Sequence, residues 1–325
     1  MKKVLLVCDK PFWAYGAIAN SLVKYNTSSE FDIDIYYLKE EPNNIEKVYK
    51  EYDLIFFMAW QLIGGMGLLK VNNYYPKINL QSCITGIHSH HAWDNKQSLP
   101  DKNTIPPKKL IRYLNRFRSI NTVSKRLYYL FKDSGVKSIF YTPNGVDTDI
   151  FKPMVPLELS GQIKIGFSGN TKSHDWRKGL TEFIIPAAEK SKVKLVTAQF
   201  SKNELVDQKE MPALYNKCDV YVCASSSEGF SLAVLEAAAC GRPVISTRVG
   251  GCEDLIQDGE NGFLVDRNVD AICDKIKLLK NDKELLVKMG NRSREIIEEK
   301  WSWEIRSKDW LDFIRSYINI HPAPV

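Results

Sequence analysis

Two glutamates with seven residues between them are the strongest candidates for chemistry in this chain of 325 residues. Glu228 is followed at once by Gly-Phe-Ser, and small or straight-chain residues lead from there to Glu236. This composition predicts a loop that feeds a helix, with Ser231 as its N-cap and Gly241 in the left-handed conformation just after its end. The first carboxylate would then lie in the loop and the second within the helix.

The start of this predicted helix is suited to an anion. The amides of Phe230, Ser231 and Leu232 point out of the first turn, where N–H groups and the helix dipole favour negative charge. Ionised carboxylates such as Glu228 and Glu236 accept hydrogen bonds from hydroxyl groups. Hydroxyl acceptors beside a phosphate-binding turn are typical of a site for a sugar nucleotide.

The segment resembles the E-x7-E signature of the GT-B-fold retaining glycosyltransferases of family 4 (glycosyl transferases group 1). Further blocks similar to that family stand in the expected order over roughly residues 120–265, whereas the N-terminal third is similar only in layout. The blocks are 143–147, 151–153, 243–246, 249–251 and 258–265. The resemblance implies an α/β GT-B fold, in which two Rossmann-like domains face each other across a cleft and the last helix crosses back to the first domain.

Strand-like and helical segments alternate along the chain, which independently favours parallel sheets in α/β domains. The stretch 151–156, with two prolines, is the best linker candidate. We therefore expect an acceptor-binding domain at 1–153, a nucleotide-sugar-binding domain at 154–303, and a crossover helix with its tail at 304–325. The expected strands are Val4–Val7, Ile33–Leu38, Leu54–Phe57, Ile78–Gln81, Ile84–Ile87, Ile120–Val123, Ile163–Phe167, Lys194–Thr197, Val220–Cys223, Val244–Ser246 and Phe263–Val265.

Composition excludes several classes of protein. With 44% hydrophobic residues and no apolar run of 18, a globular protein without a membrane span is expected. The start of the chain predicts a buried strand rather than a signal peptide, because its apolar run is short and ends in Asp9-Lys10. Seven cysteines without C-x-x-C pairs predict reduced thiols in a cytoplasmic protein.

The resemblance assigns a catalytic role to Lys178, which matches the family's Lys-Gly before a helix. Its ammonium group would stabilise the charge that develops on the departing diphosphate of the donor. The alternative is a solvated lysine at a helix start. The family usually has an arginine after the glycine that corresponds to Gly169, but this chain has Asn170. Lys172 and Arg177 are therefore equal candidates for the second phosphate-binding cation.

The two glutamates receive different roles. Glu236 would accept both ribose hydroxyls of the nucleotide, since its neighbours are all Ala, Leu and Val and a solvent-facing glutamate explains that face less well. Glu228 would contact a hexose hydroxyl, and its alternative is a loop acid satisfied by an amide. The expected donor-binding set is Gly169, Asn170, Lys172, Arg177, Gly229, Phe230, Ser231, Leu232 and Glu236.

A histidine in the first domain is the third catalytic candidate. His88 follows a predicted strand and resembles the family's histidine that faces the transferred sugar. His90 and His91 follow it, which raises the hypothesis of a metal site, but Asp94 is the only further ligand type nearby, so plain loop histidines are favoured. No metal is expected, and no cofactor beyond the nucleotide-sugar donor, UDP- or GDP-linked, as substrate.

The first loop departs from the family pattern, because only Gly16 stands where two glycines are usual. Trp13 and Tyr15 flank it, and they would shape an acceptor pocket by stacking on a sugar ring; core packing is an equal alternative. The D-x-D strings at 32–34 and 147–149 are not credible metal sites, since the first alternates onto a solvent face and the second follows an Asn-Gly turn.

Positive charge is concentrated in the first half of the chain. Residues 102–132 contain nine basic residues and no acidic one, around an apolar stripe formed by Leu110, Tyr113, Leu114 and Phe117. This stretch would dock on an anionic membrane surface or an anionic acceptor, and a solvated basic face over a core stripe is equally compatible. Nucleic acid is not expected as a partner.

The resemblance, together with these motifs, implies a retaining, metal-independent glycosyltransferase. It would move a hexose-type sugar from a nucleotide sugar to a glycan, lipid-linked or other cell-surface acceptor, as in polysaccharide biosynthesis, from the cytoplasm or the inner face of the membrane. The alternatives are a sugar-nucleotide- or glycan-binding GT-B protein with weak catalysis, and another GT-B enzyme such as a sugar-nucleotide epimerase.

Overall fold

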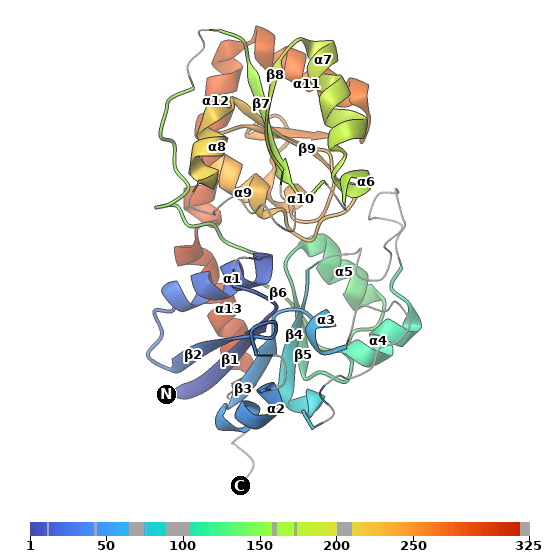
Figure 1. Cartoon of the computed structure of the whole chain (residues 1–325), viewed down its shortest axis with the longest axis vertical. Coiled ribbons are helices and arrows are strands. Elements are labelled where there is room, and N and C mark those ends of the chain that lie inside the picture. Colours follow the sequence, from blue (N-terminus) through green and yellow to red (C-terminus); the bar gives the residue numbers. More distant parts are fainter. Residues whose placement is uncertain are drawn as a thin grey trace. The chain divides into compact units, whose positions relative to one another are not determined.

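The computed structural model describes residues 1–11, 13–41, 44–64, 75, 77–88, 105–157, 161–171, 174–199 and 210–318. The chain forms two compact units (Figure 1). Unit 1 holds the described residues of 1–88, 105–145 and 303–318, and unit 2 holds those of 146–302. The chain therefore returns to unit 1 with its last helix, as the expected fold class requires.

Unit 1 is built on a six-stranded parallel sheet in the order β2-β1-β3-β4-β5-β6. Its strands are β1 (Lys2–Cys8), β2 (Phe31–Tyr37), β3 (Leu54–Phe57), β4 (Cys83–Ile87), β5 (Ser119–Thr122) and β6 (Ile139–Tyr141). Its helices are α1 (Ala14–Lys24), α2 (Ile45–Val48), η1 (Tyr49–Glu51), α3 (Gln61–Gly64), η2 (Leu80–Ser82), α4 (Lys108–Leu114), α5 (Lys125–Asp133) and α13 (Trp303–Ile318).

Burial explains the residue patterns of β1 and β2, whereas one segment of unit 1 that was expected to be a strand is not one. In β1, residues Val4–Cys8 are all buried, as a central parallel strand requires. In β2, Asp32 and Asp34 alternate onto the exposed face, as expected. The strand expected at Ile78–Gln81 is wrong: the side chain of Asn79 accepts a hydrogen bond from the amide of Gln81 at 3.1 Å and starts the 3-10 helix η2 instead.

The last helix belongs to unit 1 through its buried aromatic face. The indole Nε1 of Trp310 donates a hydrogen bond to the carbonyl of Pro143 at 2.9 Å, and the ring stacks on Phe56 with 5.9 Å between centroids. Trp310 is fully buried. A buried Trp whose N–H is hydrogen-bonded anchors a helix through its buried apolar area and through the directional hydrogen bond.

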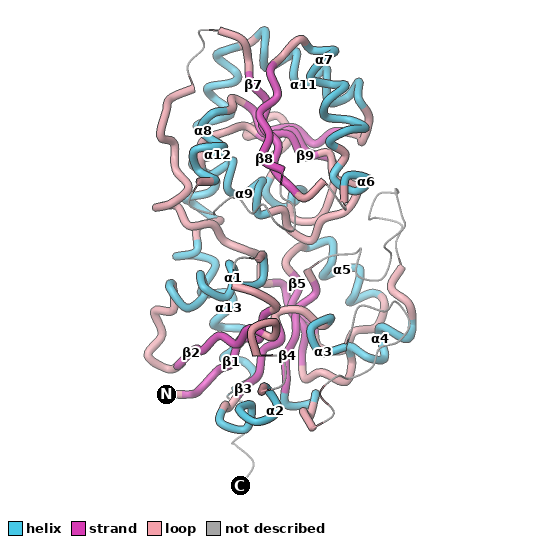
Figure 2. The backbone as a smooth tube through the Cα atoms, in the orientation of Figure 1, coloured by secondary structure: helices cyan, strands magenta, loops and turns pink. Residues whose placement is uncertain are grey.

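Unit 2 contains a five-stranded parallel sheet in the order β11-β10-β9-β7-β8. Figure 2 labels β7, β8 and β9 of this sheet. Its strands are β7 (Lys164–Gly169), β8 (Lys194–Gln199), β9 (Val220–Cys223), β10 (Val244–Thr247) and β11 (Gly262–Val265). Its helices are α6 (Asp175–Lys178), the π-helix η4 (Leu180–Ile184), α7 (Ile185–Ser191), α8 (Met211–Lys217), α9 (Leu232–Ala239), α10 (Cys252–Leu255), α11 (Val269–Asn281) and α12 (Lys283–Lys300).

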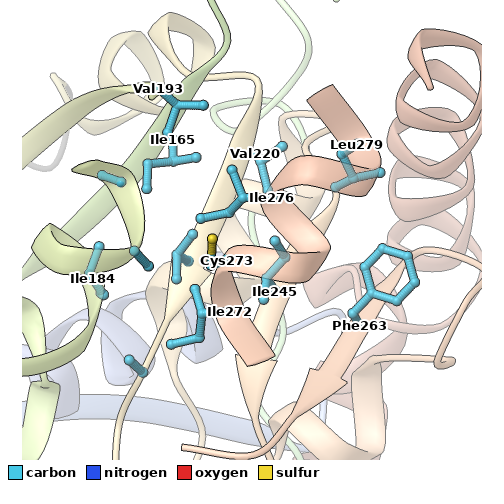
Figure 3. Packing of buried hydrophobic residues seen from close by; sticks show 14 of the residues in the cluster. Ile165, Ile184, Val193, Val220, Ile245, Phe263, Ile272, Cys273, Ile276 and Leu279 are labelled. Carbon is cyan, nitrogen blue, oxygen red and sulfur yellow. The ribbon is translucent and has the colours of Figure 1, made fainter. Parts of the chain in front are cut away.

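The core of unit 2 shows why its helices lie on the sheet (Figure 3). In α11, Ile272, Ile276 and Leu279 recur at helical spacing and are fully buried or nearly so, against strand residues such as Val220 and Ile245. Burying each such side chain contributes about 1.5–3 kcal/mol. This packing fixes the ends of the strands, where the candidate site lies.

The structure bears on two further expectations, which are reduced cysteine thiols and the lack of a membrane span. All seven cysteines are buried and unpaired. Among the described helices, none is both long enough and apolar enough to cross a membrane.

Candidate functional site

A buried carboxylate joins two cations at the carboxyl ends of β7 and β9. Oε1 of Glu228 accepts hydrogen bonds from Nη1 of Arg177 at 3.0 Å, from Nζ of Lys178 at 2.6 Å and from Oγ of Ser225 at 2.7 Å. The side chains of Glu228 and Arg177 are each 10% exposed and that of Lys178 is 17% exposed. The structure therefore brings together three of the residues expected at the site.

The electrostatics of Glu228 are dominated by its partners. Burial alone would raise the pKa of this carboxyl, but the charges of Lys178 and Arg177 and the hydrogen bonds from Lys178 and Ser225 outweigh it and lower the pKa to about 2. Glu228 is therefore ionised at any ordinary pH, and the cluster of one carboxylate and two cations keeps a net positive charge.

The cations are positioned by a short turn, in which the sequence reasoning identified the pair Lys178-Gly179 but missed Asp175. Oδ1 of Asp175 accepts from the amides of Leu180 at 3.0 Å and Thr181 at 3.3 Å, which closes the turn. Gly179 has φ of 72°, and a Cβ there would come within 2.8 Å of the carbonyl of Ala224, so only glycine fits this approach.

Arg267 fixes the same turn from the other side. Its Nε donates to the carbonyl of Ala224 at 2.9 Å and its Nη2 to the carbonyl of Trp176 at 2.8 Å, while its guanidinium lies 4.3 Å from the ring centroid of Phe183. Arg267 stands in a loop between β11 and α11, and nothing in the sequence connects it with residue 176.

The loop after Glu228 is held by close packing. The amide of Gly251 donates to the carbonyl of Gly229 at 2.8 Å, and a Cβ at Gly251 would come within 2.0 Å of the ring of Phe230. The ring of Phe230 in turn lies 5.2 Å from that of Trp301. Gly251, which belongs to the block 249–251 that is similar to the family, thus has a structural reason here.

The helix predicted after this loop is α9. Ser231 is its N-cap residue, but its side chain makes no capping hydrogen bond, so the expected side-chain cap is wrong. Gly241 has φ of 71°, as predicted for the residue after the helix end. The amide of Leu232 begins α9 and has no partner one turn earlier within the helix, which leaves this turn suited to an anion.

Glu236 lies in a setting opposite to that of Glu228. Its Oε2 accepts a hydrogen bond from the hydroxyl of Tyr215 at 2.6 Å, and its side chain is partly exposed rather than fully buried. Burial raises the pKa of Glu236 to about 7, even though the bond from Tyr215 acts to lower it. A phenol thus faces the carboxylate of Glu236, whereas two cations face that of Glu228.

The remaining donor-binding candidates are placed unequally. Gly169 ends β7, and a Cβ there would lie 3.6 Å from Cε of Lys178. Asn170 follows it directly. Arg177 reaches Glu228, as described above, whereas Lys172 lies outside the described residues, so the choice between these two cations for the phosphate stays a prediction.

In unit 1, His88 lies after β4 and packs against Tyr15, with 5.1 Å between ring centroids in an edge-on arrangement. Burial lowers the pKa of His88 to about 4, against a hydrogen bond with the backbone of Met58 that raises it. The imidazole is therefore neutral at pH 7. His90 and His91 lie outside the described residues.

The first loop places its two aromatic residues differently. Trp13 is 38% exposed, and the ammonium groups of Lys10 and Lys39 lie 4.7 and 4.8 Å from its ring centroid. Tyr15 is only partly exposed and contacts His88. A Cβ at Gly16 would come within 2.2 Å of the carbonyl of Lys10, so this glycine is required for the turn.

The basic stretch is described from residue 105 onward. The stripe residues Leu110, Tyr113, Leu114 and Phe117 are buried in unit 1, so they form core rather than an exposed apolar face. Any attraction to an anionic surface would therefore come from the cations alone.

Within the described residues, no group of three His, Cys, Asp or Glu side chains could hold a metal ion.

The family-model match lies within unit 2. Residues 195–296 match the family model described as Glycosyl transferases group 1. An uncharacterized glycosyltransferase of Methanocaldococcus jannaschii is 38% identical over 114 residues, which are 34% of this chain and 32% of that protein. A GDP-mannose-dependent alpha-(1-6)-phosphatidylinositol monomannoside mannosyltransferase of Mycobacterium tuberculosis is 33% identical over 33% of this chain and 30% of its own length. The matched stretch thus spans about a third of these curated relatives.

Solved structures match over nearly the whole chain. Sucrose-phosphate synthase from Thermosynechococcus elongatus has a TM-score of 0.75 at 16% identity, covering 99% of this chain and all of that one. HepE of Anabaena, solved in complex with UDP-glucose, has a TM-score of 0.72 at 14% identity, covering 97% of this chain and all of that one. At these identities the likeness concerns the fold, which has two Rossmann-like units with parallel sheets.

Proposed function

We propose that this chain transfers a hexose-type sugar from a UDP- or GDP-linked donor to an acceptor, because residues 195–296, in its second unit, match the family model of the group 1 glycosyltransferases. The observation that carries the proposal is the pair of cations, Arg177 and Lys178, held by the buried Glu228 at one end of the segment whose other end is Glu236. Such an arrangement suits a ligand with a diphosphate at one end and a ribose at the other.

The cations can serve the diphosphate without losing their anchor. An ammonium group has three N–H donors, and Lys178 uses one of them for Glu228. Because the side chain of Lys178 keeps 17% exposure, a ligand can reach its ammonium group. A positive cluster that is fixed before the ligand arrives stabilises charge on a departing diphosphate with little reorganisation.

The other roles follow the same division. Glu236 would accept ribose hydroxyl groups, and the first turn of α9, after Gly229, Phe230 and Ser231, would bind phosphate oxygens. Glu228 would contact the hexose, and His88 in unit 1 is a separate candidate for contacting a sugar. A neutral His88 can accept or donate one hydrogen bond at a sugar hydroxyl, which fits the direction of its pKa shift.

We further propose that transfer proceeds with retention and without a metal ion, by front-face displacement assisted by the diphosphate. A lysine–arginine pair supplies the positive charge that a metal ion would otherwise provide at the leaving group. Activity should therefore survive excess EDTA, and the anomeric configuration of the product, read by NMR, should equal that of the donor. Loss of activity that Mn²⁺ or Mg²⁺ restores would contradict the metal-free route.

The experiment that tests the function is release of nucleotide from a panel of donors. UDP-glucose, UDP-N-acetylglucosamine and GDP-mannose would first be ranked by thermal shift, because a bound ligand raises the melting temperature. The best donor is then incubated with glycan and lipid-linked acceptors. Binding without any turnover would favour a sugar-nucleotide-binding protein, and an epimerised donor would favour an epimerase.

A lipid-linked or surface-glycan acceptor would place the protein in the cytoplasm or at the inner face of the membrane. The exposed cations Lys108, Arg112 and Arg116 of the basic stretch would supply a weak attraction of roughly 1 kcal/mol each to anionic lipid. Co-sedimentation with phosphatidylserine vesicles at low and high salt tests this. Equal pelleting of the wild type and the triple alanine variant would defeat it. Arg118 is left intact because it packs on the ring of Tyr317.

A further inference from the structure

A chain of three hydroxyl groups leads from Glu236 into the protein. The proposed function gives these hydroxyl groups no role. The hydroxyl of Tyr215 on α8 lies 2.6 Å from Oε2 of Glu236 and 3.3 Å from Oγ of Ser168, which in turn lies 2.9 Å from the hydroxyl of Tyr221. All three hydroxyl-bearing side chains are buried. They come from α8, β7 and β9, so the fold and not the local sequence brings them together.

The direction of these hydrogen bonds follows from the acceptor at the end of the chain. An ionised carboxylate can only accept, so Tyr215 donates to Glu236 and spends its single proton there. Oγ of Ser168 and the hydroxyl of Tyr221 continue the chain, and the hydroxyl of Tyr221 also donates to the carbonyl of Ser168 at 3.3 Å. Hydrogen bonds linked in this way polarise one another in a buried setting.

The ring of Tyr215 leaves its hydroxyl little freedom. It packs 5.6 Å from the ring of Tyr221 and 6.1 Å from that of Phe151, and the side chain is fully buried. Only two torsion angles place the tyrosine ring and its oxygen, so this packing sets the position of the oxygen. A rigid donor on one carboxylate oxygen fixes the plane of the carboxylate.

We propose that Tyr215 is a positioning residue that holds the Glu236 carboxylate in the orientation required to accept the ribose hydroxyls of the nucleotide. The inference rests on the proposed function, since it assumes that Glu236 binds ribose. Without the bond, the carboxylate of a partly exposed helix residue would rotate among several orientations, and ordering it would weaken ligand binding. The bond also favours the ionised form of Glu236 against its burial, which supports the same role.

The test is calorimetric titration with UDP and GDP, and with their 2′-deoxy counterparts, at pH 8. Tyr215→Phe removes one oxygen and keeps the ring. It should weaken binding of the better ribonucleotide about tenfold, as for the loss of a hydrogen bond to a charged group, and should change binding of the deoxynucleotide much less. Tyr221→Phe is the matched variant: it removes a buried phenol oxygen from the same chain but keeps the direct bond to Glu236, and its effect should be smaller.

A merely structural role of Tyr215 would weaken ribo- and deoxynucleotide equally, and that result overturns the proposal. So does a loss in Tyr221→Phe that matches the loss in Tyr215→Phe, or no loss in either. If Tyr215→Phe does not fold, Ser168→Ala removes the hydroxyl that lies 3.3 Å from that of Tyr215 and should give a smaller loss that is again confined to the ribonucleotide. A wild-type protein that binds neither UDP nor GDP would instead contradict the proposed function itself.

Discussion

The two ends of the segment from Glu228 to Glu236 treat a carboxylate in opposite ways. Glu228 is held by two cations and a hydroxyl, and its pKa falls to about 2. Glu236 is held by a phenol, and its pKa rises to about 7. Burial raises the pKa of both carboxylates, although Glu236 is the more exposed of the two, so the cationic partners of Glu228 make the difference. Glu228 therefore belongs to a permanent frame, and Glu236 offers a contact that a ligand can complete.

If this contrast is correct, removal of the framing carboxylate has the largest effect. Glu228→Ala leaves Arg177 and Lys178 buried without their counter-charge, which should cost about 3–5 kcal/mol of unfolding free energy. Urea unfolding followed by circular dichroism measures this. Glu260→Ala removes an exposed carboxylate of the same unit and should change stability by less than about 0.5 kcal/mol. Equal stability of the two variants would show that the cluster is not a frame.

Removal of Lys178 distinguishes a role in the stability of the cluster from a role in catalysis. Lys178→Ala leaves Glu228 bonded to Arg177 and Ser225, so its cost in stability should be about 1–3 kcal/mol. Turnover should fall by about 10²–10³-fold, since a donor aimed at developing charge is lost. Nucleotide release at saturating donor measures the second quantity. A wild-type rate in a less stable protein would make Lys178 structural only.

At the other end, Glu236→Ala should weaken binding of the preferred donor by about 1–3 kcal/mol and leave turnover at saturation nearly unchanged. The reason is that ribose contacts are made equally before and during the reaction. Calorimetry with the donor gives the affinity, and steady-state rates give the turnover. Unchanged affinity would remove Glu236 from the site.

The two carboxylates also differ in the pH dependence of the stability that they contribute. The pKa of Glu236 is raised from 4.5 to about 7, so the folded protein binds more protons in that window, and the stability that this group contributes is lost as pH rises through it. Glu228 has a lowered pKa, so the stability it contributes is present above pH 4.5 and is lost only as pH falls toward 2.

Glu236→Gln should therefore flatten the dependence of stability on pH between pH 5 and 8. A pKa that differs by one between the folded and unfolded states corresponds to about 1.4 kcal/mol, which is large enough to detect. The unfolding free energy, measured in urea across this range, is the quantity to compare with the wild type. An unchanged slope would contradict the assignment.

The sequence predicted the fold well because local patterns and fold agree there. The buried run of β1 and the alternation of β2 follow from hydrophobic period alone, whereas the last helix was expected from the family resemblance. The exception at Ile78–Gln81 arose because the side chain of Asn79 competes with strand pairing, and apolar spacing does not report such a bond.

The candidate site was predictable only in part. The segment from Glu228 to Glu236 and the turn at Lys178 could be recognised as sequence patterns. The hydrogen bonds from Lys178 and Arg177 to one oxygen of Glu228 could not be predicted. Arg267, between β11 and α11, and Tyr215, on α8, stand outside that segment in the sequence and reach the site through tertiary packing. No spacing rule within one sequence connects such residues.

The most direct test of the proposed donor site is a crystal structure of the protein with the nucleotide sugar that stabilises it most. We predict ribose hydroxyl groups within hydrogen-bond distance of Glu236, phosphate oxygens at the first turn of α9 and at Lys178, and a Glu228 carboxylate still bonded to Arg177. A nucleotide whose ribose lies away from Glu236, or whose phosphates do not touch Lys178, would contradict the proposed site.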